Sequence, residues 1–276
     1  MRVLVTGANG YLGRGIVKHL LDDGLEVIAT DFFDDSIDKR ATIFKTNLFE
    51  IDDPFLFFNK PDVLLHLAWR DGFVHNSDAH FYDLFSHYSF IKRMINGGCK
   101  HVAVLGTMHE IGYFEGCINE NTPCNPQNLY GIAKNALRNA IDLLCGERHV
   151  FYQWLRGFYI VGNNDKGNSV FSKIVLADKE GKKVFPFTSG TNQYDFLDYD
   201  AFCTQVSLAV QQTEIGGIIN ICSGHPQRIA ERVEQFIKDN ALSIKLDYGA
   251  FPDRKYDAKK VWGDNGKILK IMKKES

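Results

Sequence analysis

The sequence predicts an α/β fold in which a doubly wound parallel sheet is covered by helices on both faces. Two observations carry this prediction. Short apolar runs alternate with segments of helical apolar spacing through the first half of the chain. A glycine-rich turn, from Gly7 to Gly13, directly follows the first apolar run and opens the first helical segment.

The elements follow in order. Val3 to Val5 forms a short apolar run, and Leu12 to Leu21 has helical spacing that stops before Gly24. Asn125 followed by Pro126 is a cap and first-turn pair, so we expect a helix to open there and end near residue 146. Residues 163–193 are predicted to be loop-rich. The remaining predictions are strands at 26–30, 62–67, 102–105, 151–155 and 218–221 and helices at 81–95 and 228–238.

Composition excludes several classes of protein. The chain has 276 residues, 45% of them apolar, which excludes wholesale disorder. No apolar run is long enough to span a membrane, and 32 basic residues against 34 acidic ones suggest no nucleic-acid partner. The start of the chain lacks the apolar core of a signal peptide. Six cysteines without a C-x-x-C pair suggest free thiols, so we expect a cytoplasmic protein.

The glycine-rich turn suggests a dinucleotide site. Gly7, Gly10 and Gly13 permit a tight turn and a close approach of the backbone to a pyrophosphate, which the helix N-terminus would attract. Asp31 ends the second predicted strand, 24 residues after Gly7, where a carboxylate can bind both ribose hydroxyls and repel a 2′-phosphate. The alternative for Asp31 is a solvated turn residue. NAD is favoured; NADP is possible, and Lys39 and Arg40 are the nearby cations expected to assist it.

Tyr130 and Lys134 stand four residues apart, so on a helix they share one face. A nearby ammonium group stabilises a phenolate and is expected to lower the pKa of Tyr130, which would make the phenol a general acid or base. The alternative is a surface tyrosine beside a lysine. His75, His80 and His87 have spacings of five and seven that match no zinc motif, so no metal site is expected.

The chain resembles the extended short-chain dehydrogenase/reductases of the NAD-dependent epimerase/dehydratase family, which act on nucleotide sugars. The segments that carry this resemblance are 6–13, 62–68, 105–112, 125–134, 155–162 and 220–224. The resemblance implies a Rossmann-type dinucleotide-binding domain over residues 1–160, to which 194–222 return. It also implies a small C-terminal substrate-binding lobe from 161–193 and 223–276, and a homodimer.

The family's site residues are carried over position by position. Thr107, Tyr130 and Lys134 match its catalytic residues, although a buried threonine at a strand end is the alternative for Thr107. Arg254 matches a residue that grips the sugar diphosphate, with an exposed arginine as its alternative. The implied cofactor-binding residues are Gly7, Asn9, Gly10, Tyr11, Leu12, Gly13, Asp31, Asn47, Leu48, Leu67, Ala68, Trp69, Tyr130 and Lys134. The implied substrate-binding residues are Trp69, Thr107, His109, Asn163, Asn164, Phe187 and Arg254.

The resemblance leaves three reactions to weigh. The stretch from Gly106 to Glu110 and the short C-terminal lobe are similar to reductases of dTDP-4-keto-6-deoxyhexoses, which make dTDP-fucose or dTDP-6-deoxytalose for surface polysaccharides. A 4-epimerase with tightly bound NAD is the second reading. A dehydratase is disfavoured, because Met108 and His109 replace its Asp-Glu pair. A non-catalytic dinucleotide sensor is the distant alternative, against which Thr107, Tyr130 and Lys134 argue.

Overall fold

The computed structural model describes residues 1–162, 169–253 and 257–274. Within them, seven strands form one sheet in which every neighbouring pair is parallel. The strand order is β11-β7-β5-β4-β1-β2-β3. The bounds are β1 (Arg2–Thr6), β2 (Glu26–Asp31), β3 (Thr42–Lys45), β4 (Val63–His66), β5 (His101–Thr107), β7 (Phe151–Gly157) and β11 (Gly217–Ile221).

In an open α/β sheet, this strand order predicts a ligand crevice at the carboxyl ends of β1 and β4. The chain runs outward from β1 through β2 to β3, and then returns to the other side of β1 with β4. Connections from the two strands therefore diverge, which leaves room for a ligand at this switch point. The strands are nearly continuous apolar runs because helices cover both faces of the sheet.

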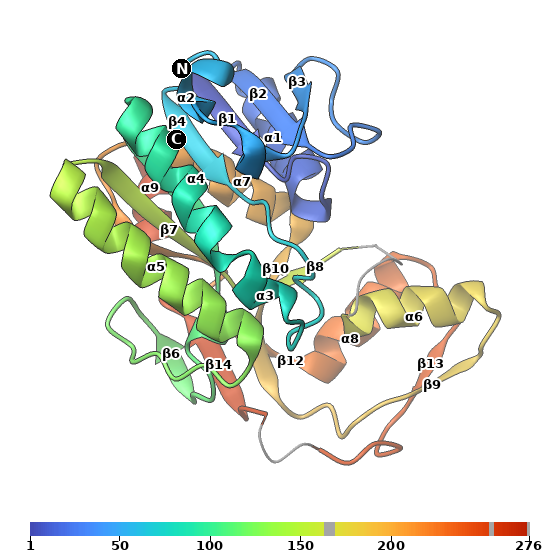
Figure 1. Ribbon diagram of the computed structural model, residues 1–276. Coiled ribbons are helices and arrows are strands. Elements are labelled where there is room, and N and C mark those ends of the chain that lie inside the picture. Colours follow the sequence, from blue (N-terminus) through green and yellow to red (C-terminus); the bar gives the residue numbers. More distant parts are fainter. Residues whose placement is uncertain (163–168, 254–256, 275–276) are drawn as a thin grey trace.

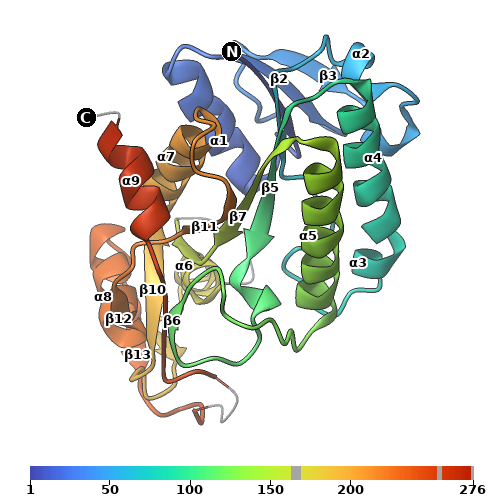
Figure 2. The same cartoon turned by 90° about the vertical axis from the view of Figure 1, so that its left-hand side faces the viewer.

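One face of the sheet is covered by α1 (Tyr11–Asp22), α7 (Tyr199–Val210) and α9 (Gly266–Lys274), and the other by α2 (Pro54–Phe57), α4 (Leu84–Gly97) and α5 (Leu129–Arg148). Figure 2 shows the sheet between α1, α7 and α9 on one side and α4 and α5 on the other. Each helix buries an apolar stripe; in α1 it is Ile16, Val17 and Leu20. The predicted doubly wound α/β fold is confirmed.

A smaller group of elements lies beside the carboxyl edge of the large sheet (Figure 1). Its centre is β10 (Gln193–Asp198), which pairs with β8 (Tyr159–Val161), β12 (Pro226–Arg228) and β14 (Lys260–Gly263), while β14 also pairs with β6 (Gly116–Ile118). Helices α6 (Val170–Lys179) and α8 (Ile229–Asp239) and the paired strands β9 (Val184–Pro186) and β13 (Lys245–Asp247) complete it. The division into two lobes at the predicted boundaries stays a prediction. Helix α9, which lies within the segment 223–276 assigned to the smaller lobe, packs on the large sheet.

Asp195 fastens this smaller group. Its buried carboxylate accepts hydrogen bonds from Ser223 N (2.8 Å), Ser223 Oγ (2.6 Å), Gly224 N (2.9 Å) and Gly263 N (3.0 Å). A buried carboxylate is tolerated where several donors satisfy it. Asp195 therefore joins β10 to the loop after β11 and to β14.

The structure corrects two predicted elements. The helix that carries Tyr130 does not open at Asn125, because Asn125 pairs with Gly112 and its N–H donates to the carbonyl of Ile111 (3.0 Å). Instead α5 begins at Leu129, with the Asn128 side chain accepting from Gly131 N (2.8 Å) as the N-cap. Residues 163–193 are not simply loop-rich, since α6 and β9 lie within them. Apolar spacing also missed several other elements, among them the strand β3 at the edge of the large sheet, the helices α7 and α9 that cover it, and most short strands of the smaller group.

Candidate active site

The turn after β1 leaves space and free donors at the start of α1. Gly7 has φ +69°, and a Cβ there would approach Ala68 N to 2.7 Å, so only glycine fits. Gly10 is the N-cap of α1 and supplies no side-chain bond to the first turn. The free N–H groups and the positive end of the helix dipole are therefore available to an anion such as a pyrophosphate.

Asp31 lies at the end of β2, directly beside this turn. Its two carboxylate oxygens accept from Asn9 N (2.9 Å) and Phe32 N (2.7 Å), and Asn9 Oδ1 accepts from Ser36 N (2.8 Å). These bonds hold the turn and the loop after β2 in one arrangement. Each carboxylate oxygen can accept more than one hydrogen bond, so Asp31 can still bind the hydroxyl groups of a ribose that approaches this turn.

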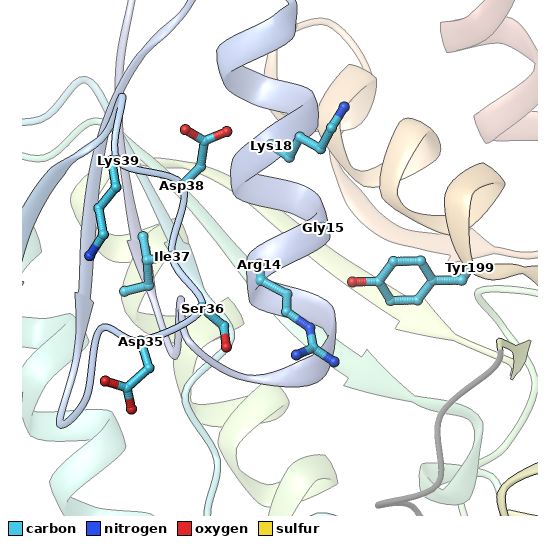
Figure 3. Close-up of a pocket in the computed structure, with 9 residues that line it drawn as sticks. All are labelled: Arg14, Gly15, Lys18, Asp35, Ser36, Ile37, Asp38, Lys39 and Tyr199. Carbon is cyan, nitrogen blue, oxygen red and sulfur yellow. The ribbon is translucent and has the colours of Figure 1, made fainter.

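Three cations in or next to the loop after β2 are paired with carboxylates. Lys39 and Lys45 pair with Asp34 (3.9 and 3.2 Å), and Arg40 pairs with Asp38 (2.7 Å). An open pocket of about 620 Å³ lies between this loop and α1, and Figure 3 shows its lining. The pocket also brings two cations that the sequence did not indicate, Arg14 and Lys18, next to the loop. Its lining consists of Arg14, Gly15, Lys18, Asp35, Ser36, Ile37, Asp38, Lys39 and Tyr199.

Other residues of the implied cofactor site have local structural partners. Asn47 caps the 3-10 turn η1 (Leu48–Glu50) by accepting from Phe49 N (3.2 Å), and Leu48 is buried in the core. Tyr11 and Leu12 open α1; the Tyr11 ring packs on Tyr199 with a centroid distance of 4.6 Å. The role of these residues toward a cofactor stays a prediction.

Leu67 and Ala68 bring the end of β4 against the turn after β1. Ala68 N donates to Thr6 Oγ1 (3.3 Å), and Leu67 N donates to the carbonyl of Thr6 (3.2 Å). The Ala68 main chain also forms the wall that excludes a side chain at Gly7. The two strand ends thus close one side of the crevice.

Tyr130 is held at the first turn of α5 by the loop that precedes α3 (Ala79–Tyr82). Tyr130 N donates to the carbonyl of His75 (2.9 Å), and Leu129 N donates to Asn76 Oδ1 (3.2 Å). These bonds satisfy helix N–H groups that would otherwise lack partners. The loop therefore fixes where the phenol stands.

Thr107, at the end of β5, reaches Tyr130 with its hydroxyl. The expected lowering of the tyrosine pKa is not found: burial raises the pKa of Tyr130, while the hydrogen bond from Thr107 lowers it and the charge of Glu110 raises it. Desolvation disfavours the phenolate more strongly than its neighbours support it. The resting state of Tyr130 is thus the phenol, a proton donor.

Lys134 follows one turn later and is 2% exposed. Its ammonium group donates to the carbonyl of Leu105 (2.8 Å) and lies 4.0 Å from the centroid of the Trp69 ring. Burial lowers the pKa of Lys134 to about 7, and the charge of Glu110 opposes that shift. Lys134 therefore titrates close to neutral pH.

Four rings surround Tyr130, and we call them the ring set. The centroid distances from Tyr130 are 6.2 Å to Trp69, 5.6 Å to His75, 5.3 Å to His80 and 5.9 Å to His109. Burial lowers the pKa of His75, and it lowers the pKa of His109 to about 4, so both are neutral near pH 7. The sequence had indicated Trp69 and His109 but gave no role to His75 or His80.

Behind Trp69 lies a buried histidine pair. His66 Nδ1 contacts Thr6 Oγ1 (2.8 Å), and His66 Nε2 contacts His87 Nδ1 (2.9 Å). Burial lowers the pKa of His66 to about 3 and that of His87 well below its ordinary value, and Lys134 adds to both shifts. The pair is neutral and supports Trp69, whose ring stacks on His87 at 4.5 Å.

Glu110 is a residue of the site that the sequence reasoning missed. It ends the 3-10 turn η2 (Met108–Glu110), in which the Thr107 hydroxyl accepts from His109 N (3.2 Å) and Glu110 Oε1 accepts from Thr107 N (2.7 Å). This reciprocal arrangement is a capping box. The spacing of a threonine and a glutamate three residues apart is visible in the sequence and was the signal available.

The remaining predicted substrate-binding residues either lie outside the described residues or are buried in the core. Asn163, Asn164 and Arg254 lie outside the described residues. Phe187 is 4% exposed and packs in the core of the smaller group of elements.

In the part of the chain that the structure describes, every helix is too short or too polar to cross a lipid bilayer. Among residues 1–162, 169–253 and 257–274, no three His, Cys, Asp or Glu side chains are grouped to hold a metal ion.

The residues at the switch point fit a dinucleotide. Three features meet at this switch point. They are the turn at Gly7, which has no room for a Cβ, the uncapped first turn of α1, and the Asp31 carboxylate at the end of β2. The fold and this crevice define a dinucleotide-binding α/β protein.

Comparison with known proteins identifies the family. A sequence model described as the NAD dependent epimerase/dehydratase family matches residues 3–222. The dTDP-6-deoxy-L-talose 4-dehydrogenase (NAD(+)) of Aggregatibacter actinomycetemcomitans is 42% identical over 269 residues, which cover 95% of this chain and 99% of that protein. The chain belongs to the NAD dependent epimerase/dehydratase family, which confirms the resemblance seen in the sequence and the choice of NAD.

Solved structures agree on the fold. A UDP-N-acetylglucosamine 4-epimerase from Methanobrevibacter ruminantium M1 superposes with a TM-score of 0.85 at 21% identity, over 98% of this chain and 91% of that one. A UDP-glucuronic acid 4-epimerase from Bacillus cereus, in complex with UDP-glucuronic acid and NAD, superposes with a TM-score of 0.80 at 19% identity, over 99% and 93%.

Proposed function

We propose that this protein is an NAD-dependent oxidoreductase that interconverts the C4 hydroxyl and the C4 ketone of a nucleotide-linked 6-deoxyhexose. The observation that carries the proposal is the contact between Thr107 and Tyr130, with buried Lys134 one turn away, beside the glycine turn. The relative at 42% identity supports dTDP-6-deoxy-L-talose and its 4-keto form as the substrate pair. dTDP-fucose is the alternative product.

The three side chains divide the work. Thr107 and Tyr130 both present hydroxyl groups, so they can hold one substrate oxygen between them. Tyr130 donates its proton to that oxygen when the ketone is reduced and accepts it when the alcohol is oxidised. Lys134 lies on the same face of α5 as Tyr130, and its positive charge stabilises the phenolate that remains after the proton is transferred. NAD, when bound, supplies or accepts the hydride.

The protonation state of Tyr130 fits its role as the proton donor when the ketone is reduced. Burial raises the pKa of Tyr130, so the resting enzyme holds the proton that reduction consumes. Oxidation needs the phenolate and should therefore become faster as pH rises.

Substrate contacts belong to the same proposal. Trp69 and His109 lie beside Tyr130, so we assign them to the sugar. Asn163, Asn164 and Phe187 remain candidates for contacts to the nucleotide, and Arg254 remains the candidate for its diphosphate. A guanidinium group at Arg254 would suit the diphosphate because it can pair bidentately with phosphate oxygens.

One experiment tests the reaction. The protein is mixed with NADH or NADPH and dTDP-4-keto-6-deoxyhexose, and separately with dTDP-6-deoxy-L-talose and NAD⁺, while absorbance of the reduced cofactor is followed. Stoichiometric loss of NADH, with product chromatography that yields the 6-deoxytalose or fucose epimer, supports the proposal. Interconversion of C4 epimers without net cofactor change would replace it with an epimerase. Cofactor binding without turnover of dTDP-, UDP- or GDP-sugars would favour a sensor.

We also propose a cytoplasmic homodimer formed by α4 and α5. Phe85 and Leu143, on these neighbouring helices, are 74% and 71% exposed. A pocket of about 310 Å³ lies between the helices, lined by Tyr88, Ala140, Leu143, Leu144 and Glu147. Large exposed apolar side chains around a pocket are typical of an interface. Light scattering should give twice the chain mass, and Leu143→Glu should give the monomer; a monomeric wild type would reject the dimer.

A further inference from the structure

Glu110 is a fully buried carboxylate that contacts N–H groups of four residues. Oε1 accepts from Thr107 N (2.7 Å) and Trp154 Nε1 (2.8 Å), and Oε2 lies 3.5 Å from Arg156 Nη2 and 3.7 Å from Arg138 Nε. Replacing a buried ion pair with apolar side chains of similar volume is often no less stable. Packing alone therefore gives no reason for a carboxylate at this place.

The charges around Glu110 do not cancel. Arg156 is completely buried, Lys134 is nearly so, and Arg138 is largely buried. The Nε atoms of Arg138 and Arg156 have no hydrogen-bond partner. Glu110 is thus one anion among three cations, and it sits directly behind the main chain of Thr107.

We propose that Glu110 is a positioning residue of the active site, which fixes the main chain of Thr107 and sets the electrostatic potential at Lys134 and Tyr130. The inference rests on the proposed function, in which those three residues act on one substrate oxygen. A potential set by fixed charges in a water-excluded site is strong, because the low dielectric screens it little.

The direction of the effect follows from the sign of the charge. The Glu110 carboxylate raises the pKa of Lys134 against the burial that lowers it to about 7, and it also raises the pKa of Tyr130. Glu110 therefore favours an ammonium group at Lys134 and a phenol at Tyr130 near neutral pH. The other titratable or charged groups that face these three residues are Arg138, Arg156 and Tyr152 around Glu110, His66 and His87 around Lys134, and His75, His80 and His109 around Tyr130.

The test follows the titration of Lys134 itself, so it does not depend on turnover. Lysine labelled with ¹³C at Cε is introduced, and the Lys134 signal is assigned by its absence in Lys134→Met. Glu110→Gln removes the anion and should lower the Lys134 midpoint by about one pH unit. Arg138→Gln removes a cation from the same cluster and should raise the midpoint.

A second readout follows the contact to Thr107. In protein labelled with ¹⁵N-threonine, the Thr107 amide, which donates to a carboxylate at 2.7 Å, should move upfield in Glu110→Gln and stay in place in Arg138→Gln. For an enzyme that turns over the sugar, the acid limb of the oxidation profile should also move to lower pH in Glu110→Gln, because Tyr130 ionises more easily.

Opposite shifts of the Lys134 midpoint in the two variants support the proposal. Midpoints that both rise toward the ordinary value of 10.5 would mean that water enters the cluster and that Glu110 serves packing alone, which overturns it. Unchanged midpoints overturn it as well. Where Glu110→Gln does not fold, Arg138→Gln decides, since an unchanged or lowered midpoint there rejects the idea. A wild type that titrates as expected but converts no sugar would reject the proposed function and leave the role of Glu110 standing.

Discussion

The ammonium group of Lys134 lies 4.0 Å from the centroid of the Trp69 ring. The same indole ring stacks against His87. Lys134 is therefore held from two directions, by an aromatic face and by the carbonyl of Leu105. Trp69 is fixed in turn, since its Nε1 donates to His80 Nδ1 (3.0 Å). The indole ring of Trp69 therefore fixes the position of the Lys134 ammonium group.

Trp69→Phe and Trp69→Leu should separate the aromatic face from the indole N–H. Both variants lose the bond to His80, but only leucine loses the face that attracts the ammonium group. A cation–π contact is worth about 0.5–2 kcal/mol, so we expect Trp69→Leu to lower kcat/KM by about tenfold relative to Trp69→Phe. Steady-state kinetics with both substrates measure this difference. Equal losses in the two variants would show that the aromatic face contributes nothing.

Tyr130→Phe should abolish proton transfer while leaving the crevice intact. The phenol contacts Thr107, whereas the main chain of Tyr130 is held independently by the carbonyl of His75 (2.9 Å). General acid–base catalysis contributes about 10²–10⁴-fold, so turnover should fall by at least about a hundredfold with NAD affinity unchanged. Fluorescence titration with NAD is the control for binding. Turnover within a factor of about three of the wild type would reject Tyr130 as the acid.

The sheet and the glycine turn were predictable from the sequence because their signals are local. Apolar runs and the spacing of Gly7, Gly10 and Gly13 do not depend on distant contacts. The start of α5 was not predictable in this way: Asn125 and Pro126 form a good local signal, but pairing of Asn125 with Gly112 overrides it. Long-range pairing is invisible in a short window of sequence.

The chemistry of the site was predictable in part. Tyr130 and Lys134 do share one face of α5, yet the pKa of Tyr130 is raised, because burial is a property of the folded molecule and not of the spacing. The ring set forms from residues between 69 and 130 that only the fold brings together. Glu110 carried a local signal, the capping box, although its arginine partners come from α5 and β7.

Asp31→Asn should weaken the preference for NAD over NADP. Asparagine can still accept from one of the two N–H groups that Asp31 now holds, so the turn should persist, while the charge that repels a 2′-phosphate is removed. The ratio of the two dissociation constants should change by about tenfold or more in favour of NADP, since each 1.4 kcal/mol is a factor of ten.

Asp38→Asn is the matched control for Asp31→Asn, because Asp38 lies in the loop after β2 and its carboxylate pairs with Arg40, whereas that of Asp31 accepts from Asn9 N in the glycine turn. It removes the same charge, and we expect a smaller change in the ratio. Equal effects from the two variants would show that the preference depends on the net charge of the loop instead of on Asp31.

The buried His66 should make the protein less stable in mild acid. The pKa of His66 is about 3 in the folded protein against an ordinary value of 6.5, so between those values the unfolded chain binds a proton that the folded chain does not. Stability therefore falls as pH drops below about 6.5, and His66 accounts for about 2 kcal/mol of that fall at about pH 5. His66→Asn, whose amide can still bond Thr6, should be less stable than the wild type near pH 7, with a difference that narrows by about this amount near pH 5. Urea unfolding at the two pH values measures it, and His225→Asn controls for loss of an exposed histidine. A difference between wild type and His66→Asn that stays constant with pH would mean that His66 takes up its proton without unfolding.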